Sequence, residues 1–94
     1  MTARYSALAL QMDCVAVNSL SDRQAVSIAM QATLDRVDTM IRGSKGFIAT
    51  FSGEALKLVV LPEYFLTGFP MGESIPLWRE KACVAMDGPE YARL

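Results

Sequence analysis

One carboxylate in this sequence stands where it could do chemistry, Glu63, which follows an apolar run and a proline. The run Leu58 to Leu61 (LVVL) is too short for a helix and rich in valine, which predicts a strand buried on both faces. Pro62 cannot donate a hydrogen bond to a sheet, so the strand is expected to end there. Glu63 would then lie beyond the carboxyl end of a parallel strand, where α/β sheets gather their ligands. It could act as a general base, or it could cap a helix or pair with a lysine.

Aromatic residues and turn signals follow Glu63 closely. Tyr64, Phe65 and Phe69 bring large apolar side chains into a loop over residues 64–76, whose glycines and prolines predict several turns. Tyr64 could form the wall of a substrate pocket, or it could bury the loop against the core. For Phe65 we expect packing in the core.

Other familiar catalytic arrangements are excluded within this chain by composition. There is no histidine, which rules out Ser-His-Asp and Cys-His catalysis and the common histidine-containing zinc sites. Cys14 and Cys83 are far apart and form no C-x-x-C pair, so a zinc knuckle or a thioredoxin-type motif is not available. We expect both cysteines to be buried and inert, and we predict no metal site.

The residues around Glu63 also resemble a known motif. The string Val59 to Phe69, Val-Val-Leu-Pro-Glu-Tyr-Phe-Leu-Thr-Gly-Phe, is similar to the first catalytic motif of the carbon–nitrogen hydrolase (nitrilase) superfamily. The resemblance implies that Glu63 is the general base of a Glu-Lys-Cys triad that cleaves small-molecule amides or nitriles without a cofactor. Tyr64 would lie at the substrate. Lys81 and the two cysteines do not match the family's lysine and cysteine motifs, which lie later in the family than residue 94.

The resemblance also implies a fold and an assembly. Members of the superfamily form an α-β-β-α sandwich, commonly paired into dimers or larger homo-oligomers, and such a domain needs about 250 residues. Residues 1–94 would be the N-terminal part of that single domain, a β-α-β portion that is incomplete by itself. Two alternatives stay open. The chain could be a catalytically inactive fragment or interaction module of the same fold, or an unrelated flavodoxin-like or Rossmann-like domain, although no G-x-G-x-x-G follows the first strand.

Two strands and a helix are expected to position Glu63. A strand is predicted over residues 5–12, and an exit loop over residues 13–20. Ser21 and Gln24 have the spacing of a capping box, which predicts the start of a helix. Apolar residues then recur every three or four positions up to the expected C-cap at Gly43, namely Val26, Met30, Leu34, Val37 and Ile41. A second strand over residues 57–61 would complete a β-α-β unit.

The remaining segments have weaker patterns. Residues 44–55 read as an extension, with a short helical face at Phe47, Ile48 and Phe51, that could line an entrance or an interface. A short helix is expected over residues 75–86, with Arg79, Glu80 and Lys81 on a solvated side. A further helix should begin at Pro89.

Composition and net charge limit the possible binding partners and predict the cellular compartment. The net charge of −1 comes without any basic patch, which argues against a nucleic acid or an anionic membrane as partner. No run of 18 apolar residues is present, so no membrane-spanning helix is expected. An N-terminus without a signal peptide and two lone cysteines together predict a cytoplasmic protein. The 52% of hydrophobic residues is high for so short a chain, and suggests a piece of something larger.

Overall fold

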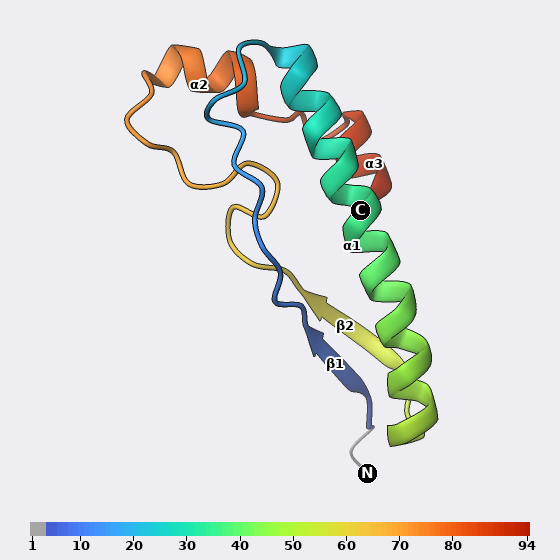
Figure 1. The fold of residues 1–94 in the computed structure, drawn as a ribbon. Coiled ribbons are helices and arrows are strands. Elements are labelled where there is room, and N and C mark those ends of the chain that lie inside the picture. Colours follow the sequence, from blue (N-terminus) through green and yellow to red (C-terminus); the bar gives the residue numbers. More distant parts are fainter. Residues whose placement is uncertain (1–3) are drawn as a thin grey trace.

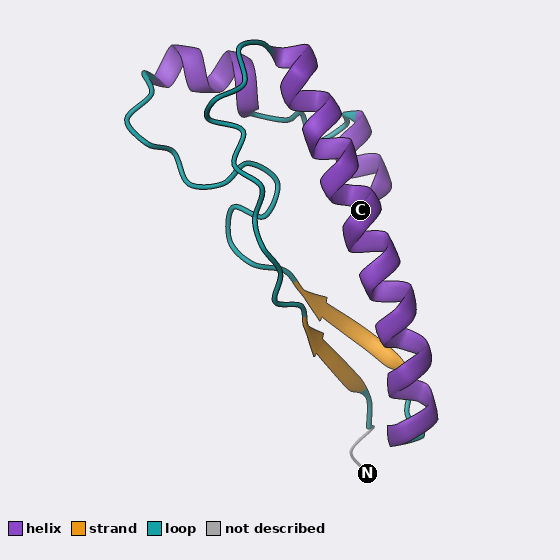
Figure 2. Cartoon of the chain, viewed as in Figure 1, coloured by secondary structure: helices purple, strands orange, loops and turns teal. Residues whose placement is uncertain are grey.

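The structure is a computed structural model, and it describes residues 4–94. Two strands and three helices follow one another in the order β1 (Ser6–Ala9), α1 (Arg23–Ser52), β2 (Leu56–Val60), α2 (Ile75–Ala82) and α3 (Pro89–Arg93). Figure 1 shows α1 running along the molecule, with the two strands beside its C-terminal half and α2 near its other end. The long loops that follow the two strands fill the space between the sheet and α2 (Figure 2).

The two strands form one parallel sheet. Ala7 pairs with Leu58, and Ala9 pairs with Val60. Since α1 connects two parallel neighbours, the segment is a β-α-β unit, and the predicted α/β class is confirmed. Strand β1 is shorter than expected and ends at Ala9 rather than near residue 12, whereas β2 has the expected length but lies one residue earlier than predicted. Within residues 4–94 there is this one two-stranded sheet, so the four layers of a sandwich are not present.

Helix α1 is longer than the sequence suggested. It begins one residue later than expected, because Asp22 rather than Ser21 is the N-cap, and the Asp22 carboxylate accepts a hydrogen bond from the Ala25 amide at 2.8 Å. At the other end the helix continues past Gly43 to Ser52. Gly53 is the actual C-cap, with a left-handed φ of +73° and its amide bonded to the Ala49 carbonyl.

The prediction of a C-cap at Gly43 was therefore wrong, and residues 44–55 are not a separate extension. A glycine inside a helix costs only about 1 kcal/mol relative to alanine, which tertiary contacts can offset. Ile41, Ser44 and Ile48 are partly buried at helical spacing, so the face that packs on the sheet continues through the glycine. The exposed Phe47 and Phe51 rings contact each other at 4.5 Å between centroids on the outer side of the helix.

The core lies at the end of the molecule away from the sheet. Val17, Val26, Met30 and Ala82 are buried together, and Leu66 and Trp78 pack against them. This cluster joins the exit loop of β1, the first turns of α1, the loop after β2 and α2. Four of the five apolar residues predicted on α1 are thus confirmed as core, because Leu34 and Val37 are also buried, whereas Ile41 is only partly buried.

The sheet is covered on one face only. Val59 lies on the α1 side and is partly buried, whereas Leu58 and Val60 on the other face are 48% and 55% exposed. The prediction of a strand buried on both faces was wrong for this chain, because no second layer is present within residues 4–94 to cover Leu58 and Val60.

Three predictions about α2 and the cysteines were also wrong. Helix α2 ends at Ala82, and its Lys81 is buried rather than solvated, because its ammonium group reaches back to a carbonyl of the β1 exit loop. Cys83 and Cys14 are both exposed. Cys83 is the C-cap of α2, and Cys14 lies in the loop after β1, so neither side chain reaches the core.

Helix α3 is held against α1 by charged groups at both of its ends. The Arg93 guanidinium donates to Asp35 at 2.6 Å and to the Gln31 side chain at 2.7 Å. At the other end, the buried Glu90 carboxylate lies 3.6 Å from Arg23. A five-residue helix is not stable by itself, so these ion pairs and its packing hold it in place.

None of the helices in residues 4–94 combines the length and the apolar composition that crossing a bilayer demands.

Candidate functional site

Glu63 lies where the sequence predicted it, just beyond the end of β2. The strand ends at Val60, and Glu63 is exposed at the start of a turn that continues to Thr67. The Tyr64 carbonyl accepts hydrogen bonds from the amides of Thr67 and Gly68, at 3.2 and 2.8 Å. Tyr64 has a φ of +58°, a left-handed conformation that few residues other than glycine adopt. The carboxylate therefore stands on a hydrogen-bonded turn with a strained residue next to it.

The exit loop of β1 holds this turn at its far end. The Val17 amide donates to the Thr67 carbonyl at 2.9 Å, and Val17 itself is completely buried. Gly68 has a φ of +72°, and a Cβ atom placed there would lie 2.7 Å from the Ala16 Cα. Only glycine allows the two loops to approach this closely. The loops that leave the two strands are thus joined at the carboxyl edge of the sheet.

Tyr64 and Phe69 form an aromatic pair across the turn. Their rings meet edge to face, with centroids 5.2 Å apart and planes at 78°. Tyr64 is 42% exposed and Phe69 is 64% exposed, so the pair lies at the surface beside Glu63 and not in the core. Phe65 is partly buried. An exposed aromatic pair next to a carboxylate can contact an apolar or planar ligand.

A polar cluster lies farther along the same loop. The Asn18 side chain donates to the Phe69 carbonyl at 3.0 Å and to the Glu73 carboxylate at 2.8 Å. The other Glu73 oxygen accepts from the Met71 amide at 2.7 Å. The Lys81 ammonium donates to the Asn18 carbonyl at 2.9 Å and lies over the Trp78 ring. Asn18 therefore connects the loop after β1, the loop after β2 and helix α2.

The hydrogen bond from Asn18 is the main reason why the pKa of Glu73 is lowered from its ordinary value of 4.5. Hydrogen bonds from the backbone amides of Glu73 and Met71 and the charge of Lys81 lower it further, against a smaller opposing effect of burial. Glu73 is therefore held as a carboxylate by the same contacts that fix the loop.

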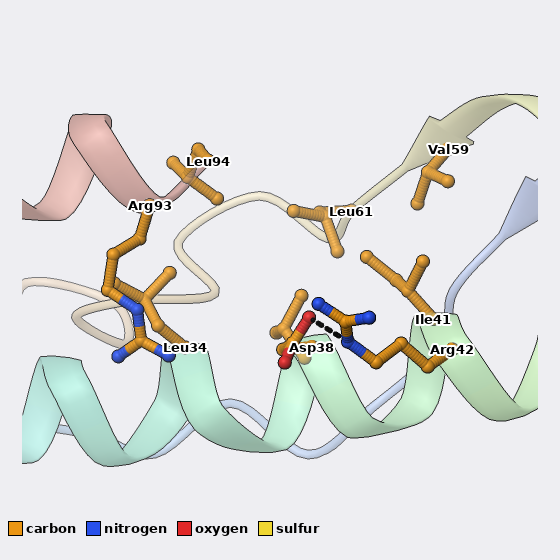
Figure 3. A pocket seen from close by; sticks show the side chains of 9 residues that line it. Leu34, Asp38, Ile41, Arg42, Val59, Leu61, Arg93 and Leu94 are labelled. Atoms are coloured by element: carbon orange, nitrogen blue, oxygen red, sulfur yellow. Dashed lines mark hydrogen bonds and ion pairs between the residues drawn. The ribbon is translucent and has the colours of Figure 1, made fainter.

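An apolar groove of about 680 Å³ lies elsewhere, between α1, β2 and α3. The apolar side chains of its lining are those of Leu34, Val37, Ile41, Val59, Leu61 and Leu94, and Figure 3 shows how they lie. Its charged groups are all in ion pairs, since Arg42 binds Asp38 within the groove at 2.9 Å and Arg93 binds Asp35 outside it. Neither Glu63 nor Tyr64 lines this groove. We place the candidate site at Glu63, because there a carboxylate is exposed beside aromatic rings.

The structure brings Glu63 and Tyr64 together on one turn, as the sequence predicted, but it adds residues that sequence reasoning missed. Asn18, Glu73 and Lys81 hold the loop, and no motif marks them. The one sequence feature that could have indicated any of them is the spacing of Lys81 and Trp78, which are three residues apart on a helix and therefore share a face. Among residues 4–94, no three Asp, Glu or Cys side chains gather closely enough to hold a metal ion.

Comparison of the chain with protein-family models, with curated proteins and with solved structures finds no match in any of the three.

Proposed function

We propose that Glu63 is the general base of a hydrolase that acts on the carbon–nitrogen bond of a small amide or nitrile. Its lysine and cysteine partners come from outside these 94 residues, from a longer chain or from another subunit. The complete domain is then the α-β-β-α sandwich, assembled as a homo-oligomer, and neither a metal nor an organic cofactor takes part. Cytoplasmic location is part of the same proposal.

The observation that carries this proposal is the position of Glu63 on a fixed turn at the carboxyl edge of a parallel β-α-β unit. That edge is where α/β sheets bind their ligands, because its loops vary while the strands hold them in place. A general base must be held at a defined position relative to the proton it takes. The bonds to the Tyr64 carbonyl and the contact of Gly68 with Ala16 supply that rigidity.

In the proposed reaction Glu63 first accepts the proton of the cysteine thiol. The thiolate attacks the amide or nitrile carbon, and the lysine stabilises the negative charge that develops on the attacked group. After ammonia or an amine leaves, Glu63 takes a proton from water, which hydrolyses the thioester. In the complete domain, Tyr64 and Phe69 supply an apolar wall beside Glu63, which helps to exclude bulk water from the acyl-enzyme.

A direct test measures hydrolysis by the protein as it is made in its native cell. The intact mass is determined first, and the purified protein is then assayed for ammonia release from a panel of aliphatic amides, aromatic amides and nitriles. We expect a mass near three times that of this 10.3 kDa chain and turnover of at least one substrate class. A protein of 10.3 kDa that releases no ammonia would contradict the proposal.

A second candidate function is a non-catalytic interaction module, and the uncovered sheet face favours it. Leu58 and Val60 expose apolar surface on a face that no helix covers within residues 4–94. If burial of this face on a partner is the main role, Leu58→Thr with Val60→Thr should reduce association without loss of the helical signal. Ile28→Thr, at an exposed apolar position on α1, is the control. Sedimentation velocity and circular dichroism measure the two effects.

A further inference from the structure

We propose that Asn18 and Glu73 are positioning residues, which clasp the loop after β2 to the loop after β1 and so fix Glu63 and the Tyr64–Phe69 pair for catalysis. This inference rests on the proposed function of Glu63. It assigns a role to two side chains that do not touch the reacting atoms and that belong to no recognised motif.

Asn18 is the only side chain of the β1 exit loop that bonds to both a backbone group and a side chain of the loop after β2 among the described residues. It donates one proton to the Phe69 carbonyl and another to Glu73. Both protons of its amide are therefore used across the junction. The bond to the carboxylate is charge-assisted, and such bonds are about twice as strong as neutral ones.

Each partner of Asn18 is held in turn. Glu73 accepts from the Met71 amide, which closes a small ring within the loop, and Phe69 carries the ring that meets Tyr64. On the opposite side, the buried Lys81 donates to the Asn18 carbonyl at 2.9 Å. The clasp therefore runs from α2 through Asn18 to the residues that follow Glu63.

This clasp acts on Glu63 through the turn. The segment between Glu63 and Phe69 is also attached by the turn bonds at Tyr64, the Val17–Thr67 bond, the close approach of Gly68 to Ala16 and the packing of Leu66 against the core. Loss of the Asn18 bonds would release the Tyr64–Phe69 pair and the far end of the turn. A displacement of about 1 Å at a catalytic group can lower the rate about 100-fold.

The test compares Asn18→Asp with Gln11→Glu. Asn18→Asp keeps the shape of the side chain but cannot donate to the Phe69 carbonyl, and it places a second carboxylate beside Glu73. Gln11→Glu makes the same chemical change at an exposed position just after β1. Hydrogen exchange of the Val17 and Gly68 amides, relative to the Met30 amide in the core, is measured in the native protein that carries this sequence.

We expect exchange at Val17 and Gly68 to become at least about tenfold faster in Asn18→Asp and to stay unchanged in Gln11→Glu. In amide or nitrile hydrolysis, kcat should fall about 10- to 100-fold with a smaller rise in KM, because the base is misplaced while the Tyr64–Phe69 pair loses its fixed position. The double variant Asn18→Asp with Glu73→Gln should regain part of the protection from exchange and part of kcat, since the glutamine amide can donate a hydrogen bond to the aspartate.

Two results would overturn the inference: exchange at Val17 and Gly68 that matches the control, or faster exchange with an unchanged kcat. A wild-type protein that hydrolyses no amide or nitrile would instead overturn the proposed function. The exchange data would then still decide whether the clasp exists, so the two failures are distinguishable.

Discussion

Gly68 lies where the two loops of the site approach too closely to leave room for a side chain. Its left-handed φ requires glycine there, and so does the 2.7 Å that would separate an added Cβ atom from the Ala16 Cα. We expect Gly68→Ala to lower the free energy of unfolding by about 2 to 4 kcal/mol, since backbone strain and a steric clash add. Gly72→Ala, where φ is +93° but the surrounding space is open, should cost only the backbone strain, about 1 kcal/mol. Urea unfolding of both variants measures the difference, and equal losses would contradict the close approach.

Glu73 makes the loop sensitive to acid. Because its pKa is lower in the folded protein than the ordinary value of 4.5, its contacts stabilise the folded loop fully above that pH. This stabilisation is lost as the pH falls through the lowered pKa. We therefore expect the Tyr64 ring resonances, followed by NMR, to shift toward free-tyrosine values below about pH 4.5. In Glu73→Gln this shift should be absent, and an identical titration in the variant would show that another group is responsible.

Helix α1 contains Gly43 in its interior and has Gly53 as its C-cap, and replacement by alanine should have opposite effects on stability at these two positions. Gly43 lies inside the helix with open space around it, so Gly43→Ala should stabilise the protein by about 0.5 to 1 kcal/mol. Gly53 is the left-handed C-cap, and Gly53→Ala should destabilise it by about 1 kcal/mol. Thermal unfolding followed by circular dichroism measures both. If Gly43→Ala lowered the melting temperature, the helix would not run through residue 43 in solution.

The same helix shows how far sequence reasoning reaches. Periodic apolar residues from Val26 to Ile41 identified the helix and its core face, because that pattern is local. Whether Gly43 or Gly53 is the C-cap could not be read from neighbouring residues alone, since it depends on whether residues beyond Gly43, such as the partly buried Ile48, pack against the rest of the molecule. The strand and its exit carboxylate at Glu63 were predictable from the run of apolar residues and Pro62.

The polar contacts that hold the loops of the site could not be predicted either, because they join residues that are far apart in the sequence. Asn18 and Glu73 are 55 positions apart, and neither lies in a periodic pattern. Lys81 was predicted to be one of three solvated charges, but α2 directs it toward the β1 exit loop, where the Asn18 carbonyl accepts a hydrogen bond from its ammonium group. Such long-range polar contacts follow from how the loops meet, and one-dimensional patterns carry little of that information.

The whole molecule is open rather than compact. Its radius of gyration is 16.0 Å, against about 12 Å for a compact domain of this length. Its accessible surface of 6797 Å² exceeds by about 1,400 Å² the value expected for a compact monomer of this mass. The exposed apolar residues on the uncovered face of the sheet contribute to that excess. Both quantities fit a β-α-β unit that completes its core with further layers, as the proposed hydrolase domain requires.

One rate comparison tests whether Glu63 is a general base. The native protein that carries this sequence is compared with its Glu63→Gln variant, with Glu80→Gln as a control for loss of an exposed carboxylate on α2. Glutamine is close to glutamate in shape but cannot take a proton from a thiol or from water. We predict that Glu63→Gln lowers kcat for amide or nitrile hydrolysis at least about 1,000-fold while circular dichroism stays unchanged, and that Glu80→Gln keeps full activity. A Glu63→Gln rate close to that of the wild type would show that Glu63 is not the general base.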